Sequence, residues 1–193
     1  MKGEFRFDEA RHEYWLGEIR LPSVTQVLAD LYEFDGIPPA VLKAAAQRGQ
    51  YVHQATELHD RDDLDWESLH PPYRPYVEAW LRFRDERKPE IVDVEKADYH
   101  RRLLYAGKRD RLLMLDGALT LADIKTTFKV SRVDALQTAG YQAIAEQDKV
   151  RIEKRVTVHL RKDGTYEVVP WDGRGDFAVF AGCLARYNWR NAA

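Results

Sequence analysis

Two β-type segments on either side of an Asp-Gly pair constrain the fold of this chain more than any other feature. Residues 103–115 and 119–126 are rich in aliphatic side chains, and Asp116-Gly117 lies between them. An Asp-Gly pair is typical of the two-residue turn that joins antiparallel strands, because both of its residues tolerate positive φ. A further β-type segment, residues 91–95, comes just before, so we expect three consecutive antiparallel strands.

The rest of the chain shows mainly helical spacing of apolar residues, and Ser23 is a candidate N-cap. The other expected elements are a hairpin or meander over residues 4–21, helices near 24–31, 40–59 and 73–87, a helix from about 131 to 150, a hairpin over 155–169 and a closing helix over 177–189. In the helix over 40–59, the apolar side consists of Val41, Leu42, Ala45, Val52 and Ala55. This order predicts an α/β fold in which helices flank a central mixed sheet.

The length of 193 residues fits one domain with a sizeable core. We divide this expected domain into an N-terminal hairpin (1–22), a helical portion (23–89) and a sheet with its helices (90–193). The chain has 30 Lys and Arg against 32 Asp and Glu, which leaves a formal charge of −2. Any surface that binds a polyanion must therefore be a local patch.

Cysteine usage and hydropathy narrow the class of protein further. The one cysteine, Cys183, can form no intrachain disulfide and cannot supply a Cys-rich zinc or iron-sulfur site. The first residues lack the apolar core of a signal peptide, and no apolar run approaches membrane-spanning length. We therefore expect a soluble cytoplasmic protein that does not enter a membrane.

An acid and a base share one face of the segment after the Asp-Gly turn. Asp123 and Lys125 are two residues apart, so both side chains of a strand would point to the same side. Asp110 and Asp123 each lie about six residues from the turn, so strand pairing would bring them together. Taken alone, an Asp-x-Lys pattern is more often an ordinary exposed strand face, because such short patterns recur by chance.

Two converging carboxylates repel each other unless a cation neutralises them. Their hard oxygen ligands suit Mg²⁺ or Mn²⁺, which keep several waters and can accept a phosphate oxygen. A metal polarises the phosphorus centre and activates a water, while Lys125 can stabilise developing negative charge. This chemistry is what hydrolysis of a phosphodiester requires.

Four motifs occur in a characteristic order between residues 48 and 141, about half of the chain. They are Gly49-Gln50-Tyr51-Val52-His53, Gly107-Lys108-Arg109-Asp110, Asp123-Ile124-Lys125-Thr126 and Gln137-Thr138-Ala139-Gly140-Tyr141. In this order and spacing the chain resembles the PD-(D/E)XK nuclease superfamily, and within it the RecB-like and phage exonuclease branch. The resemblance implies a restriction-endonuclease-like core.

The resemblance also implies roles for individual residues. Asp110 and Asp123 would be metal ligands, the Ile124 carbonyl a further ligand and Lys125 the catalytic lysine. His53 would also bind the metal, although without the other motifs it reads as a helical histidine satisfied by an acid such as Glu57. The strand acid Glu95 matches an acidic position of the branch and would bind metal or its water, or else face solvent.

The last motif lies on a helix, where residues four apart share a face. Gln137 would hydrogen-bond a ligand or Lys125, and Tyr141 would stack or hold a phosphate. Without the resemblance, Tyr141 would more often be a core aromatic. The chain departs from the branch at Lys108 and Arg109, where small or apolar residues are usual; these cations could bind phosphate or point to solvent.

The segment after Lys125 leads into this helix, so we favour Lys129 and Arg132 for contacts to the DNA backbone. The resemblance implies a metal-dependent DNA exonuclease of recombination or repair, phage or prophage encoded, that uses Mg²⁺ or Mn²⁺. The alternatives are an endonuclease, an RNA nuclease, or a noncatalytic nucleic-acid-binding or recombination-partner module with the same fold. A recombination partner protein and a homo-oligomer are compatible with the sequence.

Overall fold

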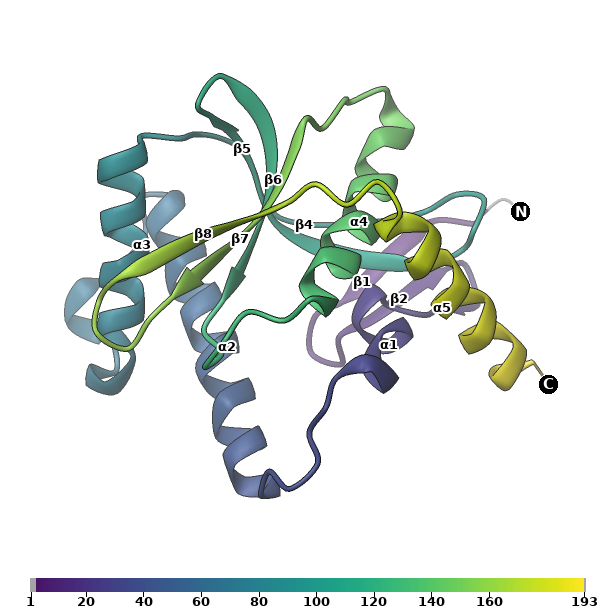
Figure 1. Ribbon diagram of the computed structural model, residues 1–193, viewed down its shortest axis with the longest axis horizontal. Helices are drawn as coiled ribbons and strands as arrows, with labels where there is room; N and C mark the ends of the chain where they lie inside the picture. Colours follow the sequence, from purple (N-terminus) through teal and green to yellow (C-terminus); the bar gives the residue numbers. More distant parts are fainter. Residues whose placement is uncertain (1–2, 193) are drawn as a thin grey trace.

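The computed structural model describes residues 3–192 and contains a five-stranded mixed sheet (Figure 1). The strands, in spatial order, are β4 (Glu90–Tyr99), β5 (Ala106–Leu115), β6 (Ala118–Lys125), β7 (Lys154–Leu160) and β8 (Tyr166–Trp171). Only the pairing of β6 with β7 is parallel. The expected run of three antiparallel strands is confirmed, and Asp116 (φ 50°) and Gly117 (φ 73°) form the positive-φ turn between β5 and β6.

Helices cover both faces of this sheet, which confirms the expected α/β class. They are α1 (Val24–Val27), α2 (Pro39–Asp60), α3 (Arg74–Arg87), α4 (Val133–Ala145) and α5 (Asp176–Asn191). Short 3₁₀ turns are found at Ala29–Leu31, Trp66–Ser68, Pro71–Tyr73 and Glu146–Asp148. None of the helices in the described range is long and apolar enough to cross a membrane.

Two hydrophobic clusters show which helices lie on which face. Ile124 of β6 is buried in a cluster with Val52 of α2 and Trp80 of α3. Leu121 of the same strand is buried in a second cluster with Tyr141 of α4. Because side chains alternate along a strand, the odd-numbered positions 123 and 125 face α4.

The N-terminal segment forms a separate three-stranded antiparallel sheet. Its strands are β1 (Phe5–Asp8), β2 (Glu13–Leu16) and β3 (Ile19–Leu21). Of the hairpin or meander expected in this region, the structure shows the meander, with Gly17 (φ 60°) in its second turn; residues 1 and 2 lie outside the described range. Ser23 caps α1 with a capping box, which fixes the exit from this sheet.

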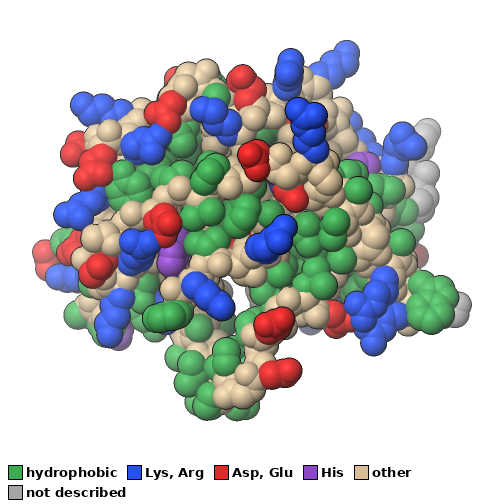
Figure 2. Space-filling view, in the orientation of Figure 1, with side chains coloured by type: hydrophobic (Ala, Val, Ile, Leu, Met, Phe, Trp, Pro, Cys, Tyr) green, Lys and Arg blue, Asp and Glu red, His purple; other side chains and the backbone are tan. Residues whose placement is uncertain are grey.

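The apolar side expected for the helix over 40–59 is buried only in its second half. Val52 and Ala55 are buried, but Val41 is 54% exposed. The reason is that the first turns of α2 project beyond the sheet, where Figure 2 shows a mainly hydrophobic projection at the lower edge of the molecule. The helix expected through residue 150 also ends early, because a 3₁₀ turn follows α4 and Lys149 (φ 64°) reverses the chain.

Candidate metal-binding site

The candidate site lies where β5 and β6 separate. Their pairing runs from the turn only as far as Arg111 and Ala122. Beyond that point the side chain of Asp110 accepts a hydrogen bond from the backbone N–H of Ile124, with 2.7 Å between N and Oδ2. Asp110 thus replaces the missing strand pairing, and the gap leaves room for side chains between the two strands.

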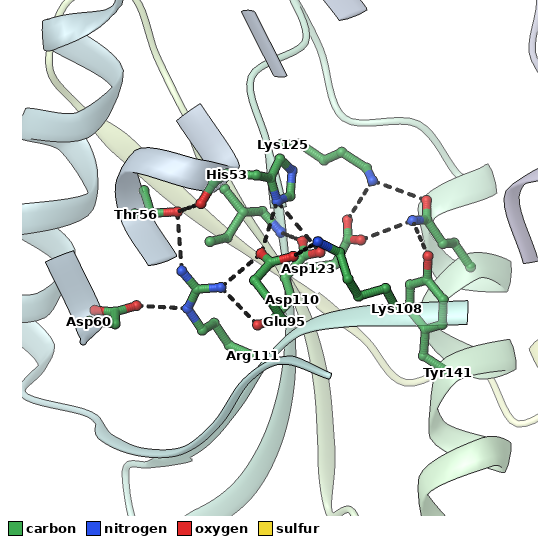
Figure 3. Close-up of polar contacts among 12 residues, drawn as sticks. His53, Thr56, Asp60, Glu95, Lys108, Asp110, Arg111, Asp123, Lys125 and Tyr141 are labelled. Atoms are coloured by element: carbon green, nitrogen blue, oxygen red, sulfur yellow. Dashed lines mark hydrogen bonds and ion pairs between the residues drawn. The ribbon is translucent and has the colours of Figure 1, made fainter. Parts of the chain in front are cut away.

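Three side chains from α2, β4 and β5 converge at this gap (Figure 3). One ligand atom from each of His53, Glu95 and Asp110 lies within 4.8 Å of the other two. The His53 Nδ1 atom is 3.4 Å from Glu95 Oε1 and 3.6 Å from Asp110 Oδ1. One imidazole nitrogen and two carboxylates can hold a divalent cation.

A second group of side chains lies beside the first, between β6 and α4. Lys125 Nζ is 2.8 Å from Asp123 Oδ2 and donates to Gln137 Oε1 at 3.0 Å. The Gln137 amide nitrogen donates to Asp123 Oδ1 and to the Tyr141 hydroxyl, each at 3.1 Å. Gln137 and Tyr141 are one helical turn apart, so α4 presents both to the strand.

The electrostatics of this second group differ from those of isolated side chains. Burial, together with the charge of Asp110, raises the pKa of Asp123 to about 7 in spite of the neighbouring Lys125. Burial acts to lower the pKa of Lys125, but the charges of Asp123 and Asp134 outweigh it and raise that pKa. Lys125 is therefore a cation at neutral pH, whereas Asp123 exchanges a proton near pH 7.

In the first group, neighbouring charges outweigh burial and favour the charged forms of Glu95 and His53. Burial disfavours the charged form of Glu95, but the hydrogen bond and charge of His53 and the charge of Lys108 lower its pKa to about 2. Burial acts to lower the pKa of His53, but Asp110 and Glu95 raise it. Without a metal, this pair is therefore an ion pair at mildly acidic pH.

Arg111 hydrogen-bonds to Glu95 of the first group, and sequence patterns did not reveal this role. Its side chain is fully buried, and Nε donates to Asp60 Oδ2 at 2.7 Å. Its Nη1 donates to Glu95 Oε1 at 3.0 Å, and Nη2 to the Thr56 hydroxyl at 3.1 Å. The signal was an arginine directly before the aliphatic run 112–115 of the strand, since a buried arginine needs acids around it.

Tyr32 is a second residue that sequence patterns did not single out. It follows the 3₁₀ turn after α1, and its hydroxyl donates to Gln137 Oε1 at 3.2 Å. Burial raises its pKa to about 12, so it remains a hydrogen-bond donor. The same oxygen of Gln137 thus receives two donors, Tyr32 and Lys125.

The four cations expected to meet DNA do not lie together. Lys108 lies in the site, with Nζ 2.8 Å from Glu95 Oε2. Arg109 is 6% exposed, donates to Asp93 and lines a different hollow. Lys129 and Arg132 are exposed on the segment between β6 and α4 and do not line the site.

Both groups open into one cleft of about 840 Å³. The residues that line it include the turn between β1 and β2, residues 9–12, and Gln50 and Gln54 of α2. The N-terminal sheet therefore takes part in the shape of the site. Sequence patterns left its role open.

Comparisons with known proteins found a shared fold but no match in sequence. No family model matches the sequence, and no curated protein matches it. Among solved structures, the alkaline exonuclease LHK-Exo from Laribacter hongkongensis superposes with a TM-score of 0.50, at 11% identity over 88% of this chain and 87% of that one. The two chains share a fold. The protein SSO0001 superposes with a TM-score of 0.40, at 13% identity over 77% of this chain and 72% of that one.

Proposed function

We propose that the protein is a metal-dependent DNA nuclease of the PD-(D/E)XK superfamily, RecB-like branch, and that it acts as an exonuclease. The observation that carries this proposal is the convergence of His53, Glu95 and Asp110 within 4.8 Å, next to the Asp123–Lys125 pair. The fold shared with an alkaline exonuclease supports it. Exonuclease action and a role in phage recombination or repair rest on the sequence resemblance.

The residues at the cleft fit a divalent cation. They offer one imidazole nitrogen and carboxylates on neighbouring strands, the donor set that suits Mn²⁺ and Mg²⁺. Asp123 Oδ2 is buried, and the Lys125 ammonium lies 2.8 Å from it, so a cation bound there would compete with Lys125 for this oxygen. When bound, such a cation polarises a phosphodiester and lowers the pKa of an attacking water.

The side chains of the second group supply charge and orientation. Lys125 stays protonated, so it donates hydrogen bonds to a phosphate oxygen or to the attacking water rather than accepting a proton. Gln137 links Lys125 to Asp123 through its two amide atoms and so fixes where the ammonium group points. Tyr141 holds the amide in that orientation from α4.

The decisive experiment incubates the purified protein with end-labelled single- and double-stranded DNA in Mg²⁺, Mn²⁺ or EDTA. We expect cleavage with metal, none in EDTA, and a loss of about a hundredfold or more in Asp110→Ala, Asp123→Ala and Lys125→Ala. The matched controls Asp63→Ala and Lys162→Ala replace exposed residues outside the cleft and should cleave like the parent.

Two outcomes would contradict the proposal. Equal cleavage by the parent and the three site variants would remove these residues from the reaction. A parent protein that binds DNA but cuts neither DNA nor a matched RNA with either metal would favour the noncatalytic binding module. Faster cleavage of the RNA than of the DNA would change the substrate class.

A further inference from the structure

Phe128 is the most exposed large hydrophobic residue in the described part of the chain. Its side chain is 100% exposed and makes no contribution to the hydrophobic clusters. Leaving such a side chain in water forgoes about 1.5–3 kcal/mol of burial. It follows Lys125 by three residues, so the two Cα atoms are at most about 11 Å apart.

Hydrogen bonds connect the segment that carries Phe128 to the rest of the protein, just after β6 ends. The carbonyl of Thr126 accepts from Arg48 Nη2 at 3.0 Å, and the guanidinium of Arg48 lies over the Tyr76 ring. The next carbonyl, of Thr127, accepts from the buried His159 Nε2 at 2.6 Å. Side chains from α2 and β7 therefore hold the segment at Thr126 and Thr127, and Phe128 extends from it into solvent.

Two basic residues follow Phe128 on the same segment. Lys129 and Arg132 are exposed on the same segment, and within residues 3–192 no carboxylate lies at ion-pair distance from either. Most other arginines of the described chain are paired with acids. Figure 2 shows basic and acidic side chains mixed over one face of the molecule. An exposed aromatic ring beside unpaired cations is the combination that single-stranded nucleic acids recognise.

We propose that Phe128 stacks on an unpaired base of the DNA while Lys129 and Arg132 contact the flanking phosphates. This proposal rests on the proposed nuclease function and deepens it, because it makes single-stranded DNA the substrate that reaches Lys125. Inside a duplex, away from its ends, both faces of each base are covered by neighbouring bases, so a ring stacks on an unpaired base or on a terminal base pair. Even at the B-form rise of about 3.4 Å per nucleotide, which is shorter than the spacing in an extended single strand, Phe128 lies within about three nucleotides of Lys125.

The test measures DNA binding in EDTA, where no cleavage is expected. Fluorescently labelled single-stranded DNA and a long blunt-ended duplex of equal charge are titrated with the parent, Phe128→Ala, Phe128→Leu and Phe128→Trp. The matched control is Trp189→Ala, which removes an aromatic residue that is 80% exposed near the end of α5. We expect Ala and Leu at position 128 to weaken single-strand binding by about 5- to 100-fold, while Trp restores it.

The duplex should bind with equal affinity to the parent and to all three variants at position 128. Single-strand binding by Phe128→Ala equal to that of Trp189→Ala would overturn the proposal. An equal loss for single strand and duplex would overturn it too, as would a parent that does not bind single strands. The binding test contains no metal, so its result is independent of cleavage. A parent that binds in this pattern in EDTA but cuts nothing with Mn²⁺ would refute the nuclease function and leave the stacking role standing.

Discussion

At the scale of single residues, the site depends on buried charges that compensate one another. Arg111 is fully buried between Asp60 and Glu95, and it also lies over the Trp80 ring. An arginine in this position orients Glu95 toward His53, because its planar fork fixes the directions of several hydrogen bonds at once. Removing it leaves two acids in a poorly hydrated environment.

We therefore expect Arg111→Met to lower the free energy of unfolding by about 3 kcal/mol, because it leaves two buried carboxylates without this partner. Chemical denaturation measures the change. Arg82→Met is the matched control, since Arg82 is half exposed on α3 and pairs only loosely with Glu86; its effect should stay below about 1 kcal/mol. Equal effects of the two substitutions would contradict the role of Arg111.

Two residues of the site make the stability of the metal-free protein fall as pH rises. Folding raises the pKa of Asp123 from 3.8 to about 7, and it raises the pKa of His53 above 6.5. Near pH 7 the folded state therefore binds more protons than the unfolded state, so the free energy of unfolding decreases with increasing pH. The stabilisation from these bound protons is complete below the pKa values of the unfolded chain. It is lost as the pH rises through the pKa values of the folded protein.

In EDTA we expect the free energy of unfolding to fall by about 1–2 kcal/mol between pH 6 and pH 8. Asp123→Asn should reduce that fall, because an amide does not ionise. Mn²⁺ should reverse it in the parent, because the cation stabilises the ionised carboxylates. Thermal melts across this pH range measure the effect, and a stability that rises with pH in EDTA would contradict the assigned pKa shifts.

At the scale of elements, patterns within one segment predicted the structure well. The Asp-Gly turn and the alternation of Asp123, Ile124 and Lys125 predicted the β5–β6 hairpin and the face of the site, because both depend only on neighbouring residues. The register of contacts between distant segments could not be predicted. Arg111 and Asp60, for example, are 51 residues apart, and no local pattern indicates that they meet.

The projecting half of α2 shows a second limit of sequence patterns. Val41 and Ala45 occupy helical positions typical of a buried face, yet no sheet lies beneath them. Periodicity predicts which side of a helix is apolar, but it does not predict where the helix ends relative to the sheet. The N-terminal alternation left a hairpin or a meander open, because the three residues of β3 carry too little alternation to decide between them.

Close packing between β5 and α4 leads to a prediction at Gly107. A Cβ atom at this position would lie 2.5 Å from Tyr141 Cε1, and the ring would have to move. Gly107→Ala should therefore lower the free energy of unfolding by about 1–3 kcal/mol. It should also displace Tyr141, whose hydroxyl accepts a hydrogen bond from Gln137. Gly182→Ala, where a Cβ meets nothing within 4 Å on α5, is the control and should be neutral or stabilising. Thermal melts that rank the two in the opposite order would contradict this packing.

At the scale of the whole molecule, the charge is nearly balanced at −2, so attraction of DNA depends on local groups of cations. The cleft itself holds paired cations, because Lys108 and Lys125 each lie beside an acid. If the protein binds DNA as proposed, we expect the segment between β6 and α4 to meet phosphates through its exposed residues Lys129 and Arg132.

We expect the double variant Lys129→Ala/Arg132→Ala to reduce the slope of log K against log salt for single-stranded DNA by about 1.4, since each phosphate contact contributes about 0.7. The measurement is binding in EDTA over a range of salt concentrations. Lys162→Ala, on the turn between β7 and β8, should leave the slope unchanged. An unchanged slope in the double variant would place the phosphate contacts elsewhere.

The most direct test of the proposed activity compares Mn²⁺ binding with DNA cleavage in the same variants. Calorimetric titration and cleavage of end-labelled DNA are measured for the parent, Asp110→Ala and Lys125→Ala. We predict that Asp110→Ala loses both binding and cleavage, whereas Lys125→Ala still binds Mn²⁺ but cleaves at least about a hundredfold more slowly. Full cleavage by Lys125→Ala, or strong Mn²⁺ binding and cleavage by Asp110→Ala, would contradict the proposed site.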